Sequence, residues 1–151
     1  MNLSAQNKKG FTLIELLVVI GILAVLLAIT LIAINPARQF AQANNTKRAS
    51  DVNAILNAIN QYMVDKKGVV PSGIDTTLKN IGSAVGDADI CGDLVATYIA
   101  QMPFDPKTGS WTSCATYDSQ YSVVQGSADN RITVSAPDTE APLTTPISVT
   151  R

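Results

Sequence analysis

Histidine does not occur in this 151-residue sequence, so the commonest general base, which is also a frequent metal ligand, is missing. The sequence also has neither a G-x-S-x-G nucleophile motif nor a glycine-rich loop of the kind that cradles phosphates. These absences argue against an enzyme, and we expect no catalytic residues.

An excess of basic residues is lacking too, because 11 Lys and Arg residues stand against 12 Asp and Glu, for a net charge of −1. The charges are distributed unevenly. Residues 11–67 carry five basic and three acidic side chains, whereas residues 68–151 carry four basic and nine acidic ones. This acidic C-terminal part is a poor candidate for binding nucleic-acid phosphates.

A complete calcium motif is also missing. The segment 87–93, Asp-Ala-Asp-Ile-Cys-Gly-Asp, superficially resembles the start of a calcium loop. An EF-hand needs a carboxylate at its twelfth position, and that position here is Tyr98. We therefore read these aspartates as solvated loop and helix-cap residues, and we expect no cofactor and no metal.

One carboxylate, Glu15, stands near the start of an otherwise apolar run from Phe11 to Ile34. A charge at the centre of a membrane helix costs about 2.5–3.5 kcal/mol on insertion scales. Glu15 lies only four residues into the run, or about 6 Å at 1.5 Å per residue, so its cost is lower. It nevertheless favours a partner of opposite charge. Its position in the apolar run therefore suggests a function that involves a specific partner.

The segment 10–20, Gly-Phe-Thr-Leu-Ile-Glu-Leu-Leu-Val-Val-Ile, resembles the processing site of type IV prepilins and pseudopilins. The resemblance rests on Gly10 before the cut, Phe11 after it, Glu15 at the fifth mature position and Lys8 and Lys9 in front. It implies cleavage between Gly10 and Phe11 by a membrane-embedded prepilin peptidase, and N-methylation of the new Phe11 amine. It further implies that Glu15 pairs with the Phe11 amine of a neighbouring subunit during assembly.

Two simpler interpretations compete with this one. A signal anchor would also show basic residues followed by about 24 mostly apolar residues, which can span a bilayer. A secretory signal peptide would be cut after the apolar run. The A-x-A pattern there, Ala41-Gln42-Ala43, lies well beyond the run and inside a helical pattern, which argues against such a peptide.

The sequence predicts an α+β fold in which a long N-terminal helical spine packs on a small antiparallel β-sheet head, as in pilins. We expect a break at Asn35-Pro36, because proline disfavours helix at the residue before it, and a second weak point at Gly21. We leave open whether Arg38, Lys47 and Arg48 form a solvated face or a subunit contact. The expected segments are a cleaved leader at 1–10, a transmembrane and assembly helix at 11–34, an amphipathic helix at 35–67, a head at 68–135 and an extended or mobile tail at 136–151.

Within the head we expect a loop over 74–86 and a short helix over 94–101 with Asp93 as its N-cap. The Pro-x-Asp-Pro pattern at 103–106 resembles the turn that precedes the sheet in pseudopilins. Strands are predicted over 111–117, 121–125 and 131–135, with turns at 118–120 and 126–130. A further short strand at 147–149 is compatible with the tail.

The two cysteines, Cys91 and Cys114, favour a disulfide, because their number is even and the head is expected to face outward. A pair of reduced thiols is the alternative. Major pilins often close a C-terminal loop with a disulfide, but 37 residues follow Cys114 here, so this bridge does not match that arrangement. Some pseudopilins bind calcium in a head loop, which leaves room for Asp118 or Asp129 to contribute, although neither is named as a ligand.

We interpret the chain as a structural subunit of a type IV pilus-like filament, with the Pro-x-Asp-Pro turn favouring a type II secretion pseudopilin. A type IV pilin of an adhesion, motility or DNA-uptake pilus is the alternative, and an uncleaved membrane-anchored binding or sensor domain is the second. The expected partners are further copies, other pilin-like subunits, the prepilin peptidase and an inner-membrane assembly platform. We expect a single-pass protein of the bacterial inner membrane with a cytoplasmic N-terminus, later part of a periplasmic or extracellular filament.

Overall fold

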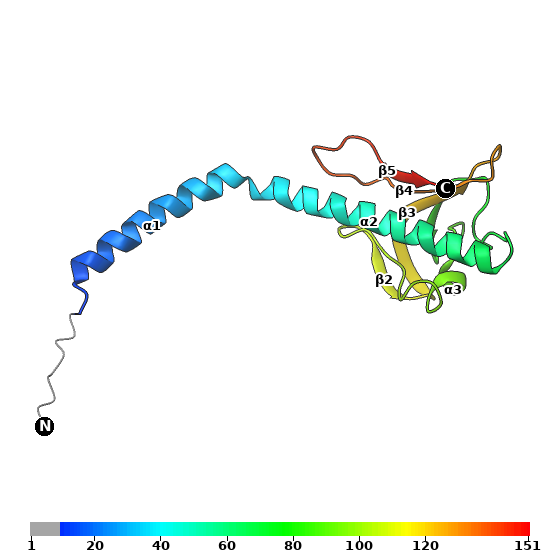
Figure 1. Ribbon diagram of the computed structural model, residues 1–151, viewed down its shortest axis with the longest axis horizontal. Coiled ribbons are helices and arrows are strands. Elements are labelled where there is room, and N and C mark those ends of the chain that lie inside the picture. The colour runs from blue at the N-terminus through cyan, green and yellow to red at the C-terminus, as the bar shows by residue number, and fades with distance from the viewer. Residues whose placement is uncertain (1–9) are drawn as a thin grey trace, which may run out of the picture. The chain divides into compact units, whose positions relative to one another are not determined.

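The computed structural model describes residues 10–151 (Figure 1). Lys8, Lys9 and the rest of the expected leader lie outside the described residues. The chain forms two units, one ending at Gln39 and one running from Phe40 to Arg151, and each is described by itself.

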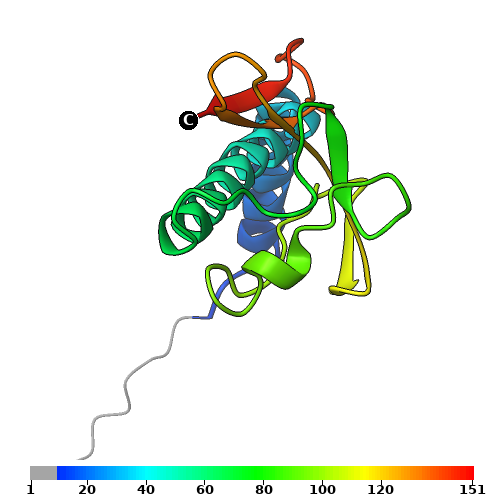
Figure 2. The ribbon, with the colours of Figure 1, turned by 90° about the vertical axis from the view of Figure 1, so that its right-hand side faces the viewer.

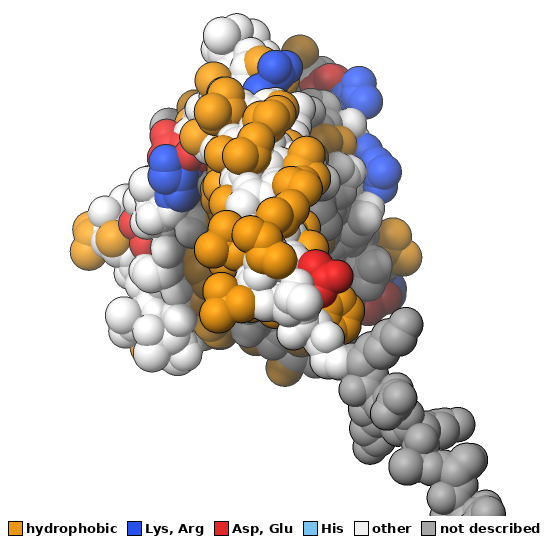
Figure 3. Space-filling model, turned by 90° about the vertical axis from the view of Figure 1, so that its left-hand side faces the viewer, with side chains coloured by type: hydrophobic (Ala, Val, Ile, Leu, Met, Phe, Trp, Pro, Cys, Tyr) orange, Lys and Arg blue, Asp and Glu red, His pale blue; other side chains and the backbone are white. Residues whose placement is uncertain are grey.

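The N-terminal unit contains α1, Leu13–Ile34, which is long and apolar enough to cross a membrane. None of its residues is buried within the chain. Figure 3 shows hydrophobic side chains gathered in a band down the middle of the face that is turned to the viewer. The helix passes through Gly21 without a break, and it ends at Asn35, whose backbone is left-handed with φ 46° and ψ 80°. Pro36 then starts α2, Pro36–Asp65, at a first helical position where its missing N–H costs no hydrogen bond.

The second unit is built around α2 and a five-stranded antiparallel sheet. The strands are β1 (Lys79–Gly82), β2 (Ser110–Ser113), β3 (Thr116–Gln125), β4 (Ile132–Ala136) and β5 (Ile147–Thr150). Their order is β1-β3-β4-β5, and β2 also pairs with β3. Figure 2 shows these strands lying along one side of α2, and the expected α+β, pilin-like fold is confirmed.

The core of this unit is an apolar layer between α2 and the sheet. On α2, Val52, Ile55, Leu56 and Ile59 recur at three- and four-residue spacing and are completely buried. The sheet and its connections contribute the opposing side chains, among them Ile81, Leu94, Tyr121, Ile132 and Val134. All of the buried hydrophobic residues in the described part of the chain lie between Val52 and Ala136.

The short helix of the head is not where we expected it. The structure has α3 at Cys91–Leu94, with Ile90 at its N-cap and no side-chain capping bond, and residues 95–101 are not helical. Asp93 is therefore not an N-cap; its carboxylate instead accepts hydrogen bonds from the backbone N–H and the hydroxyl of Ser72. The tertiary bond to Ser72 replaced the local capping that the sequence favoured.

Two other predictions about the head were wrong. The segment 118–120 is not a turn but part of β3, because Gln120 takes a φ of 59° and lets the strand continue. The expected loop over 74–86 contains β1. The short strand that was compatible with the tail at 147–149 is present as β5, which pairs with β4 over four residue pairs, from Thr133 with Thr150 to Ala136 with Ile147.

Candidate functional site

The predicted cleavage site lies on open backbone before α1. Phe11 is 89% exposed, and a methyl group added at Gly10 would meet no other atom within 4 Å. The φ of Gly10 is also not in the region that favours glycine. Nothing in the fold of the described residues therefore requires glycine at position 10, so a requirement for glycine there would come from a protein that recognises the segment.

Glu15 is held by Thr12 rather than by Phe11. The Thr12 hydroxyl accepts a hydrogen bond from the Glu15 backbone N–H, and the Glu15 carboxylate accepts bonds from the Thr12 N–H at 2.8 Å and from its hydroxyl at 2.7 Å. This is a capping box, which satisfies two of the backbone donors that a helix N-terminus leaves free. Sequence reasoning missed Thr12, although Thr-x-x-Glu before an apolar run is a recognisable pattern for it.

The capping box leaves the charge of Glu15 without a counter-charge. Within residues 10–151, no basic side chain lies within 4 Å of its carboxylate. The neighbouring residues of the first turns are Ile14, Val18 and Val19, which line a shallow apolar groove together with Phe11 and Glu15. The arrangement can accept an ammonium group from outside the chain.

The head contains a second polar constellation, which is buried. Arg48 on α2 and Asp105 in the Pro-x-Asp-Pro turn are each 1% exposed, and their side chains form a two-point ion pair with N–O distances of 2.5 and 3.2 Å. Asp105 also accepts the backbone N–H groups of Lys107 and Thr108. Burial alone would raise the pKa of Asp105, but the hydrogen bonds from Arg48 and these two N–H groups outweigh it and lower the pKa.

The basic residues of α2 therefore have different roles. Arg48 is neither a solvated residue nor an exposed subunit contact, and both alternatives for it were wrong. Lys47 is partly exposed, binds Asp51 at 2.9 Å and the Phe104 carbonyl at 3.1 Å, and lies over the Phe104 ring. Arg38 is exposed, and for it both alternatives stay open.

The disulfide expected between Cys91 and Cys114 is present, with the two Cα atoms 5.3 Å apart. It joins α3 to the turn between β2 and β3. Cys91 is itself the first residue of α3, and Cys114 lies between the two strands.

The acidic residues of the head form local bonds. Asp118 accepts from Asn80 and Gln120, and Asp129 accepts from the backbone N–H of Arg131. Asp89 accepts from the hydroxyl of Tyr117, whose pKa is raised chiefly by burial and further by this bond. Over residues 10–151, no group of three or more Cys, Asp or Glu side chains is arranged to hold a metal ion.

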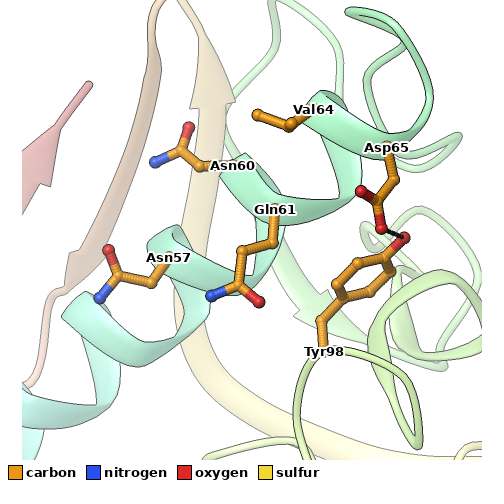
Figure 4. A pocket seen from close by; sticks show the side chains of 6 residues that line it. All are labelled: Asn57, Asn60, Gln61, Val64, Asp65 and Tyr98. Carbon is orange, nitrogen blue, oxygen red and sulfur yellow. Dashed lines mark hydrogen bonds between the residues drawn. The ribbon is translucent and has the colours of Figure 1, made fainter.

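An open pocket lies beside the C-terminal end of α2 (Figure 4). Three amide side chains, a valine and a carboxylate border it together with Tyr98, which donates its hydroxyl to Asp65 at 2.9 Å. The lining residues are Asn57, Asn60, Gln61, Val64, Asp65 and Tyr98. None of these residues belongs to the predicted site. Most of them are polar side chains of α2, as expected for a helix face that is exposed to water.

A family model described as the prokaryotic N-terminal methylation motif matches residues 5–31. No curated protein and no solved structure matches the chain. The match supports the resemblance of the N-terminal segment to type IV prepilins and pseudopilins, whose subunits are structural rather than catalytic. It covers Gly10, Phe11, Thr12 and Glu15, and it does not reach the head.

Proposed function

We propose that this chain, which carries a prepilin-type methylation motif and a pilin-like α+β fold, is a structural subunit of a type IV pilus-like filament. The observation that carries the proposal is Glu15, a carboxylate in an apolar helix with no counter-charge among the described residues. Cleavage after Gly10 would create a free amine on Phe11, and that ammonium group from a neighbouring copy would neutralise Glu15. In a low-dielectric environment neither group is stable alone, so pairing favours assembly.

Each partner follows from this assignment. A prepilin peptidase cuts between Gly10 and Phe11, and the new Phe11 amine is N-methylated. Before assembly, the chain lies in the inner membrane as a single-pass protein with its N-terminus in the cytoplasm. An assembly platform then adds it to further copies and other pilin-like subunits. It is not an enzyme and it requires no cofactor.

Within this class we favour a type II secretion pseudopilin. The support is the Pro-x-Asp-Pro turn at 103–106, which precedes the β2–β3 hairpin and resembles the turn that precedes the sheet in pseudopilins. A pilin of an adhesion, motility or DNA-uptake pilus is the alternative. Deletion of the gene in its own host separates the two, because a pseudopilin is needed for export of secreted proteins, whereas a pilin is needed for surface pili.

Processing tests the subunit assignment itself. Intact-mass analysis of the membrane fraction should give a chain that starts at Phe11 and carries one additional methyl group. A bulky substitution such as Gly10→Leu should leave the leader attached without altering the fold, because position 10 contacts nothing else. A wild-type chain that keeps residues 1–10 in a cell with an active prepilin peptidase would instead support an uncleaved, membrane-anchored binding or sensor domain.

A further inference from the structure

The connection between β4 and β5, residues 137–146, crosses beside α2 with little of its own surface buried. Eight of its ten residues are exposed, and only Thr139 and Glu140 are partly buried. We refer to residues 137–146 as the strap. A segment with so few buried side chains gains little stability from packing, so it must be held by polar contacts.

Most of those contacts converge on one residue, Glu140. Its carboxylate accepts from Asn44 at 2.7 Å, from Lys107 at 2.6 Å and from Arg48 at 3.4 Å. Its backbone is bound as well, because the Asn45 side-chain amide donates to the Glu140 carbonyl at 2.6 Å and accepts from the Glu140 N–H at 3.0 Å. Glu140 therefore joins the strap to both α2 and the turn after Asp105.

The remaining hydrogen bonds of the strap are weak or internal. Asp138 accepts from the Thr108 hydroxyl at 3.3 Å. Two backbone bonds, Thr139 to Pro137 and Leu143 to Glu140, stay within the strap, as does the bond from the Thr139 hydroxyl to the Thr145 carbonyl. Over the described residues, the hydrogen bonds that attach the strap to the rest of the head are those of Glu140 and the single Asp138 contact.

The strap borders an open groove rather than the filled core. This groove of about 640 Å³ lies between α2 and the C-terminal segment, bordered by small and polar residues of the helix and by apolar ones of the segment. The lining residues are Gln42, Asn45, Thr46, Ala49, Pro142, Leu143 and Ile147. Detaching the strap would expose this helix surface without opening the core, which lies between Val52 and Ala136.

We propose that the strap is a lid locked onto α2 by Glu140, and that it opens locally while the rest of the head stays folded. The residues that bind Glu140 in the closed state of the lid are Asn44, Asn45, Arg48 and Lys107. Arg48 keeps its partner Asp105 when the lid opens, so opening leaves no buried charge unpaired. The lid would open in a single chain, whether or not the chain assembles into filaments.

Hydrogen–deuterium exchange of the full chain in detergent tests the lid. In the wild type, the hydrogen-bonded strap amides of Thr139, Glu140 and Leu143 should exchange at least tenfold faster than β3 amides, because they open without global unfolding. Glu140→Gln removes charge-assisted bonds to Lys107 and Arg48 and should speed strap exchange by a further tenfold or more while β3 stays unchanged. The matched control, Asp138→Asn, removes the same charge from the same segment and should leave strap exchange within about twofold.

Three results would overturn the lid. Strap amides could be as slow as those of β3 in the wild type, the two variants could have equal effects, or Glu140→Gln could raise exchange equally in strap and core. If Glu140→Gln does not fold, Lys107→Met provides the second test, because it removes one of the three side-chain partners and keeps the buried Arg48–Asp105 pair. It should also speed strap exchange selectively, and unchanged exchange in that variant would contradict the proposal.

Discussion

The side chains of Arg48 and Asp105 form an ion pair that is almost completely buried, so each depends on the other. We expect Arg48→Met to destabilise the head by about 3–5 kcal/mol, the usual cost of leaving one member of a buried pair without its partner. Urea unfolding of the detergent-solubilised chain, followed by the fluorescence of its one tryptophan, Trp111, measures this. Arg38→Met is the control; it removes the same charge from an exposed position and should change stability by less than about 0.5 kcal/mol.

The pH dependence of that difference identifies its cause. In the wild type the lowered pKa of Asp105 gives stability that is present above the unfolded pKa and is lost as the pH falls through the folded pKa. In Arg48→Met the largest opposing bonds are gone and burial raises the pKa of Asp105 instead. The difference in free energy of unfolding between the wild type and Arg48→Met should therefore become smaller as the pH falls into the acid range. A difference that stays constant with pH would show that Arg48 acts through packing alone.

Glu15 is the residue on which the assembly proposal depends. Glu15→Leu should leave membrane insertion and cleavage intact, since it makes the helix more apolar and leaves Gly10 in place, but filaments should be lost or strongly reduced. Glu15→Asp keeps the charge on a shorter side chain and should retain more filaments than Glu15→Leu. The measurement is the ratio of sheared filaments to mature, membrane-bound subunit, and wild-type filament levels in Glu15→Leu would exclude the pairing role.

At the scale of single elements, the C-terminal end of α2 carries a small strain. Lys67 has a φ of 55°, and the bonds from Gly68 N–H to the Met63 carbonyl and from Lys67 N–H to the Val64 carbonyl form a Schellman motif around it. The left-handed residue that closes the helix is Lys67, and Gly68 follows with a φ of 92°.

Lys67→Gly should therefore stabilise the head by up to about 1 kcal/mol, because glycine adopts this conformation without a Cβ penalty. The matched control is Gln61→Gly, an exposed position inside α2, which should lose about 1 kcal/mol. Urea midpoints of the two variants measure both effects. A destabilised Lys67→Gly would show that contacts of the lysine side chain outweigh the backbone strain.

Elements with a strong periodic pattern could be predicted, and those that depend on tertiary contacts could not. The apolar run predicted α1, and the three- and four-residue spacing of apolar side chains predicted the buried face of α2. The proline predicted the break at Asn35. By contrast, β1 is only four residues long and is set by pairing with β3. The conformation of Gln120 could not be predicted either, because no local sequence pattern indicates a left-handed residue within a strand.

At the scale of the whole molecule, the assembly motif and the head network differ in how they can be recognised. Gly10, Phe11, Thr12 and Glu15 lie within six residues of each other, so the chain itself places them together. The head network joins positions 57 and 92 residues apart, from Arg48 to Asp105 and to Glu140. Nothing in a single sequence marks such a contact, which is why Arg48 read as a surface residue.

The division into two units predicts that the head folds without the membrane helix. Among residues 10–151, every buried hydrophobic residue lies between Val52 and Ala136, the buried polar residues begin at Asn45, and no residue of α1 is buried. A fragment from Phe40 to Arg151 should therefore be soluble and unfold cooperatively. Its melting temperature should lie within a few degrees of that of the full chain in detergent, since it keeps the disulfide, the core and the Arg48–Asp105 pair. It should form no filaments even when processed subunits are present, because it lacks Phe11 and Glu15. A fragment that unfolds without a cooperative transition would mean that residues before Phe40 stabilise the head through contacts beyond those described.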